Sequence, residues 1–257
     1  RAGPRPARHP LSGEAAGRSL SVALPRAVVF DLDDTLLDTT GLEAEMLVGL
    51  CSALNEELPG VEFDHLRERF RDGRDHLYER VLSGELDIPT YRRLHLIAVC
   101  EPWGEPSEAM QATAARLRDE QLGRSRFVEH AIELLRSLRE AGVRTGLLTN
   151  GPSWMQRRKV ELLGLEGQLD AIGISEELGA SKPDPAAFTA TLELMGSAPD
   201  DTVMVGDHLD WDVRGALAAG MRGAVWVAGD EDERHPPPGA MKVARLGEVP
   251  AALAALA

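Results

Sequence analysis

"AVVFDLDDTLLD", residues 27–38, places four acidic residues directly after a short apolar run. An apolar run of this length predicts a strand that is buried on both faces of a parallel sheet. Carboxylates that crowd together repel one another, so the acidic cluster costs stability unless a cation lies among them. The stretch therefore predicts a buried strand that ends at a site for a cation.

Four further apolar runs of strand length follow, and helical patterns lie between the later ones. The runs are TGLLT (145–149), AIGIS (171–175), TVMVG (202–206) and AVWV (224–227). In VEHAIELLRSLREAG (128–142), apolar residues recur with helical spacing as far as Gly142, and glycine commonly ends helices. Strands that alternate with helices predict an α/β protein with a doubly wound, Rossmann-like parallel sheet.

Residues 39–126 break this alternation, because their apolar residues keep helical spacing between the breaks ELPG, SGELDIP and EPWGEP. A helical block inserted after the first strand predicts an all-helical cap domain at 39–126, beside a core formed by residues 26–38 and 127–257. Two apolar stripes carry the helical interpretation: Met46, Leu47, Leu50 and Leu54, and then Leu94, Ile97 and Ala98.

The composition of the N-terminal segment and the spacing of the cysteines predict a disordered tail and a reducing compartment. Arg, Pro, Gly and Ser dominate residues 1–25, and we expect a disordered tail there. Its apolar stretch LSVAL is shorter than the centre of a signal peptide. Cys51 and Cys100 have neither metal-binding nor redox spacing, so they are expected to be free thiols in a reducing cytoplasm.

Net charge limits the classes of partner. The 257 residues carry a formal net charge of −14, with an isoelectric point near 5.0, which argues against a general nucleic-acid or anionic-membrane binder. No run approaches the roughly 18 apolar residues of a membrane span. An anionic small molecule still fits, provided that a metal and a few local cations reverse the field at the site. We expect a monomer or a homodimer.

Polar side chains follow the predicted strands, at the ends that meet in the ligand crevice of α/β folds. Oxygen ligands from carboxylates suit Mg²⁺, and one carboxylate can act as a nucleophile while a second acts as general acid and base. A hydroxyl, backbone N–H groups and a lysine can hold the oxygens of a transferring phosphoryl group. In chain order these side chains are Asp31, Asp33, Thr149, Asn150, Lys182, Asp207 and Asp212.

Four ordered motifs carry a resemblance to a known family. FDLDDTLLD (30–38), LLTNG (147–151), SKPDP (181–185) and VGDHLDWDVRGALAAGM (205–221) resemble those of the haloacid dehalogenase superfamily, in its phosphatase branch with a helical cap. Within that branch they are most similar to the N-acylneuraminate phosphatases and related sugar-phosphate or nucleotide phosphatases. The resemblance implies Mg²⁺-dependent hydrolysis of a small phosphorylated metabolite through an aspartyl-phosphate.

The resemblance also implies a role for each acidic residue. Asp31 would be the nucleophile and a ligand of Mg²⁺. Asp33 would be the general acid/base, with its backbone carbonyl on the metal. Asp207 would be the third protein ligand. Asp212 would either bind the metal through water or orient Lys182.

The phosphate-binding residues and their polar neighbours receive separate interpretations. Thr149, the backbone N–H of Asn150 and Lys182 would hold the phosphoryl group, with Lys182 also bridging to the nucleophile. Of the neighbours, we interpret Asp34 as a variable position without a catalytic role, Asp38 as a hinge or helix start, Thr35 as a cap of a turn or helix, Asp184 as a turn stabiliser, and the cluster at 157–159 as a solvated basic face.

Several alternatives share this pattern. A phosphomutase of the same superfamily would share the first half-reaction, and a non-catalytic binding or regulatory protein could use the same fold. A dehalogenase would leave Asp33 without a task. Phosphonate hydrolysis, in the family pattern, needs a lysine from the cap, and residues 39–126 contain none.

Arginines are numerous in the predicted cap, and one or two of them are expected to face the crevice and bind an anionic leaving group. Pairing with nearby acids at the surface is the alternative for each. They include Arg67, Arg69, Arg71, Arg74, Arg80, Arg92 and Arg93.

Overall fold

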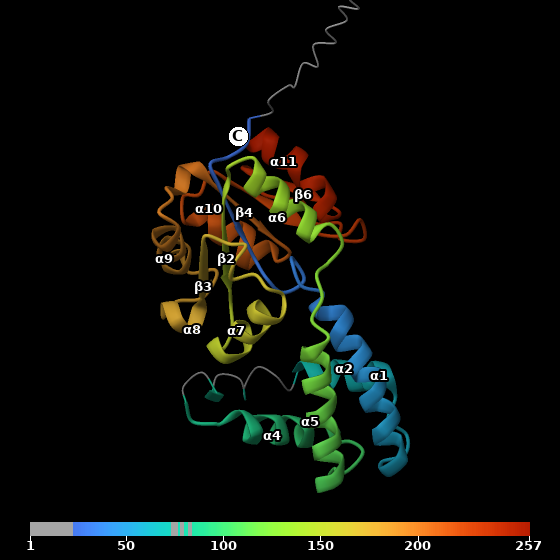
Figure 1. The fold of residues 1–257 in the computed structure, drawn as a ribbon. Coiled ribbons are helices and arrows are strands. Elements are labelled where there is room, and N and C mark those ends of the chain that lie inside the picture. The colour runs from blue at the N-terminus through green and yellow to red at the C-terminus, as the bar shows by residue number, and fades with distance from the viewer. Residues whose placement is uncertain (1–22, 73–76, 78–79, 82–83) are drawn as a thin grey trace, which may run out of the picture.

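The computed structural model describes residues 23–72, 77, 80–81 and 84–257, so the predictions for most of the N-terminal tail and for Arg74 lie outside the described residues. Six parallel strands form one sheet in the order β3-β2-β1-β4-β5-β6, with helices on both faces (Figure 1). The predicted α/β class and doubly wound sheet are confirmed. The strands are β1 (Ala27–Phe30), β2 (Arg144–Thr149), β3 (Ala171–Ile174), β4 (Thr202–Gly206), β5 (Gly223–Val227) and β6 (Ala240–Val243).

The sequence patterns predicted five of these strands and missed β6. This strand pairs only with β5, at one edge of the sheet, and three of its four residues are only half-buried. Its sequence AMKV therefore lacks the continuous apolar character that marks the central strands. A half-buried edge strand that contains a lysine does not have the continuous apolar pattern that predicts a buried strand.

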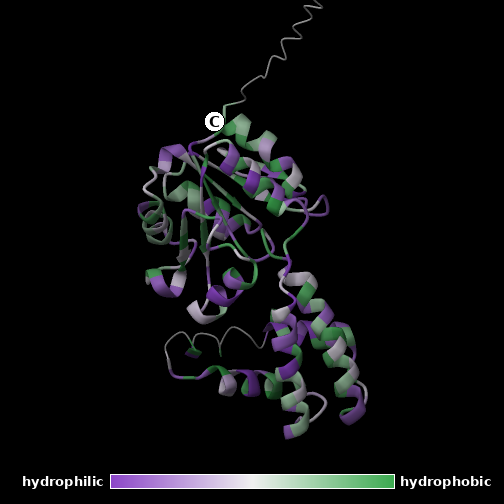
Figure 2. Ribbon diagram, viewed as in Figure 1, coloured by the Kyte–Doolittle hydropathy of each residue, from purple (hydrophilic) through white to green (hydrophobic). Residues whose placement is uncertain are grey.

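Alternate residues of the central strand β1 pack against different helical layers. Val28 and Phe30 share an apolar cluster with α6 (Ala131–Glu140) and α11 (Val249–Leu256). Ala27 and Val29 share another with α9 (Pro185–Met195). All four side chains are at most 1% exposed, and Figure 2 shows hydrophobic colour along the strands of the sheet as well as on several helices. Burial on both faces explains why these strands are continuously apolar.

Short helical elements complete the region around the sheet. Two of them are important below, because α7 follows β2 and η2 follows β4. They are α7 (Ser153–Leu162), α8 (Ser175–Leu178), η1 (Pro199–Asp201), the π-helical segment η2 (Leu209–Arg214), α10 (Gly215–Ala218) and η3 (Leu246–Glu248). Within the described residues, no helix is both long and apolar enough to span a lipid bilayer.

Four described helices lie beside the sheet region and have an apolar cluster of their own (Figure 1). They are α1 (Thr39–Glu57), α2 (Phe63–Asp72), α4 (Ile88–Cys100) and α5 (Glu108–Gly123). The predicted breaks ELPG and EPWGEP separate helices as expected, whereas α4 already begins within SGELDIP. The apolar stripe of α1 is buried as predicted, whereas the predicted stripe of α4 is only half-buried. Its buried face is His95, Leu96, Val99 and Cys100.

Two linker segments that lie side by side connect these helices to the sheet region. Leu37 bridges to Phe127, and the backbone N–H of Asp38 donates to Arg126 O at 3.1 Å. The Asp38 carboxylate accepts from Gly41 N at 2.9 Å, at the start of α1, and from the Arg126 guanidinium at 2.7 Å. One carboxylate thus starts the first helix and joins the outgoing and returning segments.

We predict that Leu50→Ala destabilises the protein by about 2–5 kcal/mol, because Leu50 is fully buried in the cluster of the four helices and truncation leaves a cavity. Val48→Ala, at a position of α1 that is 59% exposed, should change the free energy of unfolding by less than about 0.5 kcal/mol. Urea-induced unfolding of both variants measures the difference. Equal effects would show that the cluster contributes no packing energy.

Candidate active site

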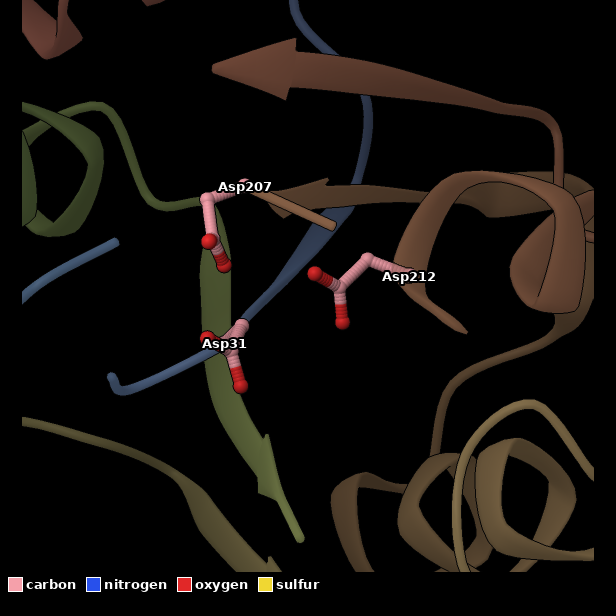
Figure 3. Close-up of side chains that lie close together, drawn as sticks. All are labelled: Asp31, Asp207 and Asp212. Atoms are coloured by element: carbon pink, nitrogen blue, oxygen red, sulfur yellow. The ribbon is translucent and has the colours of Figure 1, made fainter. Parts of the chain in front are cut away.

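Three carboxylates converge at the carboxyl ends of β1 and β4. Asp31 follows β1, Asp207 follows β4 and Asp212 lies on η2. Because β1 and β4 are paired neighbours, with Asp31 N donating to Val205 O at 2.9 Å, their ends meet. Figure 3 shows the three side chains pointing toward one another, and one oxygen from each lies within 4.8 Å of the others. Three of the predicted acidic residues therefore form one cluster.

Lys182 supplies a buried cation to this cluster. Its Nζ lies 2.5 Å from Asp31 Oδ1 and 2.6 Å from Asp212 Oδ1, and its side chain is only 3% exposed. Burial lowers the pKa of this ammonium group, but the two carboxylates raise it by more, so Lys182 stays charged. Lys182 therefore compensates part of the negative charge of the cluster, as its predicted position beside the nucleophile requires.

Asp207 is the third carboxylate of the cluster, and the ion pairs of Lys182 are with Asp31 and Asp212. Burial raises the pKa of Asp207 to about 7, with a further increase from the charges of Asp212 and Asp34. The Thr35 hydroxyl donates to its Oδ1 at 3.4 Å. A divalent cation with a preference for oxygen ligands fits this place, because it would relieve the repulsion that burial and the neighbouring carboxylates create.

Backbone groups near Asp212 fix the position of its carboxyl group. Its Oδ2 accepts from His208 N at 2.8 Å, and its Oδ1 contacts Lys182. A β-carbon at Gly206, the last residue of β4, would overlap the Asp212 carboxyl group. Only glycine therefore leaves room for this carboxylate at the strand end. The contact with Lys182 is the one expected if Asp212 orients this lysine.

Asp33 points away from the three-carboxylate cluster and toward α7. Its Oδ1 accepts from Lys159 Nζ at 2.6 Å and from the Thr39 hydroxyl, and its Oδ2 accepts from Gln156 Nε2 at 2.9 Å. Burial raises the pKa of Asp33, but the charge of Lys159 and the hydrogen bonds outweigh it, so the pKa lies below its usual value. Asp33 is therefore held as an oriented carboxylate.

The interpretation of residues 157–159 as a solvated basic face is wrong for Lys159. Its side chain is 11% exposed and pairs with Asp33. Arg157 and Arg158 do pair with surface acids, Glu177 and Glu161. The helical spacing could have predicted this, because Gln156 and the buried Val160 are four residues apart and lie on the same inward face of α7. That face continues to Lys159.

The predicted phosphate-binding residues lie at the same end of the sheet. Thr149 is buried, and its hydroxyl accepts from Gln156. The Asn150 side chain has a role that the sequence did not predict. Its Nδ2 donates to Lys182 O, and its Oδ1 accepts from Lys182 N, both at 2.9 Å. Asn150 thus fixes the loop that carries Lys182.

Four side chains near the predicted site test the predicted local roles. Asp38 caps α1, which agrees with the predicted helix start. Asp184, predicted to stabilise a turn, caps α9 by accepting from Ala186 N at 2.9 Å. Thr35 differs, because its buried hydroxyl points to Asp207 instead of capping a turn. Asp34, with a φ of 58°, accepts from the backbone N–H and the hydroxyl of Thr40.

A cavity of about 370 Å³ lies between α7 and the helices of residues 39–126. Asp33, Gln156 and Lys159 line it from the sheet side, and Arg92 and Arg118 line it from α4 and α5. The prediction that one or two cap arginines face the crevice is confirmed for Arg92; Arg118 was not among those named. Arg67, Arg69 and Arg80 pair instead with Asp64, Glu101 and Glu85.

Known proteins resemble this chain in sequence. The sequence model of a hydrolase family, the haloacid dehalogenase-like hydrolases, matches residues 25–220. The chain is 32% identical over 212 residues to an N-acylneuraminate-9-phosphatase of Homo sapiens, covering 79% of this chain and 82% of the relative. It is 37% identical over 161 residues to a phosphoserine phosphatase of Thermus thermophilus, covering 63% of each.

A solved structure of similar fold supports the same relationship. The structure of a HAD phosphatase from Thermococcus onnurineus superimposes with a TM-score of 0.60 at 28% sequence identity, covering 87% of this chain and 95% of that one. The similarity of fold therefore extends over most of this chain.

We predict that Gly206→Ala lowers phosphatase turnover about 100-fold, because the added methyl group must displace the Asp212 carboxyl group and with it Lys182. The overpacking should also cost about 1–3 kcal/mol of stability. Gly167→Ala is the control, since an added β-carbon there meets no atom within 4 Å. Initial rates and thermal unfolding measure both effects. Unchanged turnover in Gly206→Ala would show that the position of Asp212 does not affect the reaction.

Proposed function

The chain belongs to the haloacid dehalogenase-like hydrolase family and is one of its phosphatases, and we propose that it hydrolyses small phosphorylated metabolites through an aspartyl-phosphate on Asp31. The observation that carries this proposal is the pair of buried contacts from Lys182 to Asp31 and Asp212, with the Asp207 carboxylate in the same cluster. A charged lysine beside a carboxylate nucleophile suits the capture of a phosphoryl group.

The proposed first step is the attack of an Asp31 oxygen on phosphorus. The bond from phosphorus to the leaving oxygen breaks, and that oxygen receives a proton from Asp33. Asp33 is a carboxylate in the free protein, so it must first take up a proton, which the negative phosphoryl group beside it favours. Thr149, the Asn150 N–H and Lys182 would hold the equatorial oxygens.

The second proposed step hydrolyses the phospho-enzyme. Asp33, now a carboxylate again, takes a proton from a water molecule as the water oxygen attacks phosphorus. The bond from phosphorus to Asp31 breaks, which releases inorganic phosphate and restores the Asp31 carboxylate. The contacts of Asp33 with Lys159 and Gln156 hold it in the charged form that this step needs.

Mg²⁺ is the metal that this donor set favours. Asp31 and Asp207 would hold it with their carboxylates, and the Asp33 backbone carbonyl with its oxygen, as the family resemblance implies. Mg²⁺ would supply positive charge that offsets the repulsion between the phosphoryl group and these carboxylates.

The cavity limits the size of the substrate. Its volume of about 370 Å³ lies near the lower end of the range of about 300–1,000 Å³ for small-molecule sites. We favour sugar phosphates or nucleotides of small size, in agreement with the N-acylneuraminate-9-phosphatases and the glyceraldehyde 3-phosphate phosphatase among the relatives. The helices of residues 39–126 would act as the cap that excludes bulk water during the reaction.

Two arginines of the proposed cap suit a leaving group with a negative charge. Arg92 pairs with Asp119 at 2.7 Å and lies over the Trp154 ring at 6.0 Å. Arg118 donates to Arg92 O at 3.2 Å and to His95 Nδ1 at 2.6 Å. His95 accepts this bond and donates from Nε2 to the Phe70 carbonyl, so its ring is neutral. These contacts orient a guanidinium at the wall of the cavity.

We predict that p-nitrophenyl phosphate is hydrolysed in the presence of Mg²⁺, that chelation abolishes the reaction, and that Asp31→Asn reduces it to the buffer background. The variant keeps the size of the side chain but replaces the nucleophilic carboxylate by a neutral, weakly nucleophilic amide. Asp210→Asn is the control, because Asp210 lies in the motif that contains Asp207 and Asp212 but pairs with Arg214 at the surface. Product absorbance measures all four reactions. Turnover in Asp31→Asn equal to that of the unmodified protein would exclude the proposed mechanism.

We predict that Arg118→Lys lowers kcat/KM for phosphoglycolate about 10-fold to 100-fold more than for ethyl phosphate, which has no carboxylate, because a charged hydrogen bond contributes about 1.5–3 kcal/mol. Arg116→Lys, on the exposed side of α5, should leave the ratio of the two values unchanged. Phosphate release measures both reactions. The same loss for both esters would mean that Arg118 does not recognise a charged leaving group.

A further inference from the structure

One face of α7 reaches the proposed acid/base residue with two side chains. Gln156 and Lys159 lie three residues apart, a spacing that places them on the same side of a helix. Both contact the Asp33 carboxylate, Gln156 at 2.9 Å and Lys159 at 2.6 Å. The family resemblance implied no role for either. Two polar side chains aimed at one carboxylate indicate a function beyond helix packing.

The contacts leave Asp33 little freedom to rotate. Oδ1 accepts from Lys159 and from the Thr39 hydroxyl, and Oδ2 accepts from Gln156. The donors come from two helices, α1 and α7, that are far apart in the sequence. Rotation of the carboxyl group would break several hydrogen bonds at once, and hydrogen bonds to charged groups are among the strongest.

Gln156 also joins Asp33 to the residues that follow β2. The same amide nitrogen contacts the Thr149 hydroxyl and lies 3.0 Å from the Asn150 carbonyl. The buried Oε1 of Gln156 has no hydrogen-bond partner among the described residues. A flipped amide would turn this oxygen toward Asp33 and the Asn150 carbonyl, which are both acceptors. The acceptors around the nitrogen therefore fix the orientation of the amide.

The helix that carries these side chains is itself anchored. Gly151 N donates to the Ser175 hydroxyl at 2.9 Å, and Ser153 N donates to Glu176 at 2.6 Å, just before and at the start of α7. Val160 is fully buried in the apolar cluster on one face of the sheet. Gln156 and Lys159 are thus presented by a fixed support, as precise positioning requires.

We propose that Gln156 and Lys159 are positioning residues that aim the Asp33 carboxyl group at the leaving-group oxygen. The inference rests on the proposed function, in which Asp33 gives its proton to that oxygen while the oxygen–phosphorus bond breaks. Lys159 and Gln156 neither donate this proton nor bind the phosphoryl group. They hold the donor at the distance and angle that proton transfer needs.

The effect of this role on the reaction rate depends on how basic the leaving group is. An alkyl phosphate releases a strongly basic alkoxide unless a proton arrives as the bond breaks, whereas p-nitrophenyl phosphate releases a stable phenolate. Loss of a well-placed acid should therefore reduce kcat/KM for an alkyl ester and have little effect for the nitrophenyl ester. A residue that only stabilises the fold or binds the phosphoryl group affects both esters alike.

The test compares Lys159→Met with the unmodified protein on ethyl phosphate and on p-nitrophenyl phosphate, both with Mg²⁺. We expect kcat/KM to fall about 10-fold to 100-fold for the ethyl ester and less than about 3-fold for the nitrophenyl ester. Arg158→Met is the matched control, because Arg158 lies on the exposed side of α7 and pairs with Glu161. It should change neither value. Equal losses on both esters, or no loss on either, would overturn the proposal.

Gln156→Glu provides a second test at nearly constant side-chain volume. The new carboxylate would face Asp33 and the Asn150 carbonyl, so it should repel the group that Gln156 now holds. The loss on the ethyl ester should exceed the loss on the nitrophenyl ester, whose hydrolysis also slows because Gln156 contacts the Thr149 hydroxyl. Thermal unfolding checks that the variant folds. If the unmodified protein hydrolyses neither ester, the proposed function fails. If it hydrolyses both and the variants keep the ratio, only this inference fails.

Discussion

Charge balance at the carboxyl ends of β1 and β4 is the constraint on which the rest of the structure depends. Two buried carboxylates and one buried ammonium group lie within hydrogen-bond distance, and removing one member of such a group typically costs several kcal/mol. Neighbouring residues hold these charged groups in position. Gly206 leaves room for Asp212, the N–H of His208 fixes it, and the side chain of Asn150 holds the loop of Lys182.

The candidate site consists of two electrostatic groups with different supports. Asp31, Asp207 and Asp212 converge with Lys182 at the strand ends, where all but the half-buried Asp207 are buried. Asp33 comes from the same short stretch of sequence, yet α7 holds it beside the cavity. This division suits a mechanism with two carboxylates, because each needs different surroundings for nucleophilic attack and for proton transfer.

The helices of residues 39–126 complete the cavity while keeping an apolar cluster of their own. The connection to the sheet region is narrow and polar, with Asp38 joining the two linker segments through Arg126. The wall with Arg92 and Arg118 therefore belongs to helices whose apolar cluster is separate from the buried charges at the strand ends.

The sequence by itself determined the class of the fold and most of the candidate site. Buried parallel strands must be apolar throughout, and their carboxyl ends meet, so side chains after each run were bound to converge. Tertiary structure alone decided which groups touch: Gln156 and Lys159 reach Asp33, the Asn150 side chain holds the Lys182 loop, and Arg118 lines the cavity. These contacts depend on how helices are rotated and seated against the sheet, and one residue of rotation, as on α4, changes which side chain faces inward.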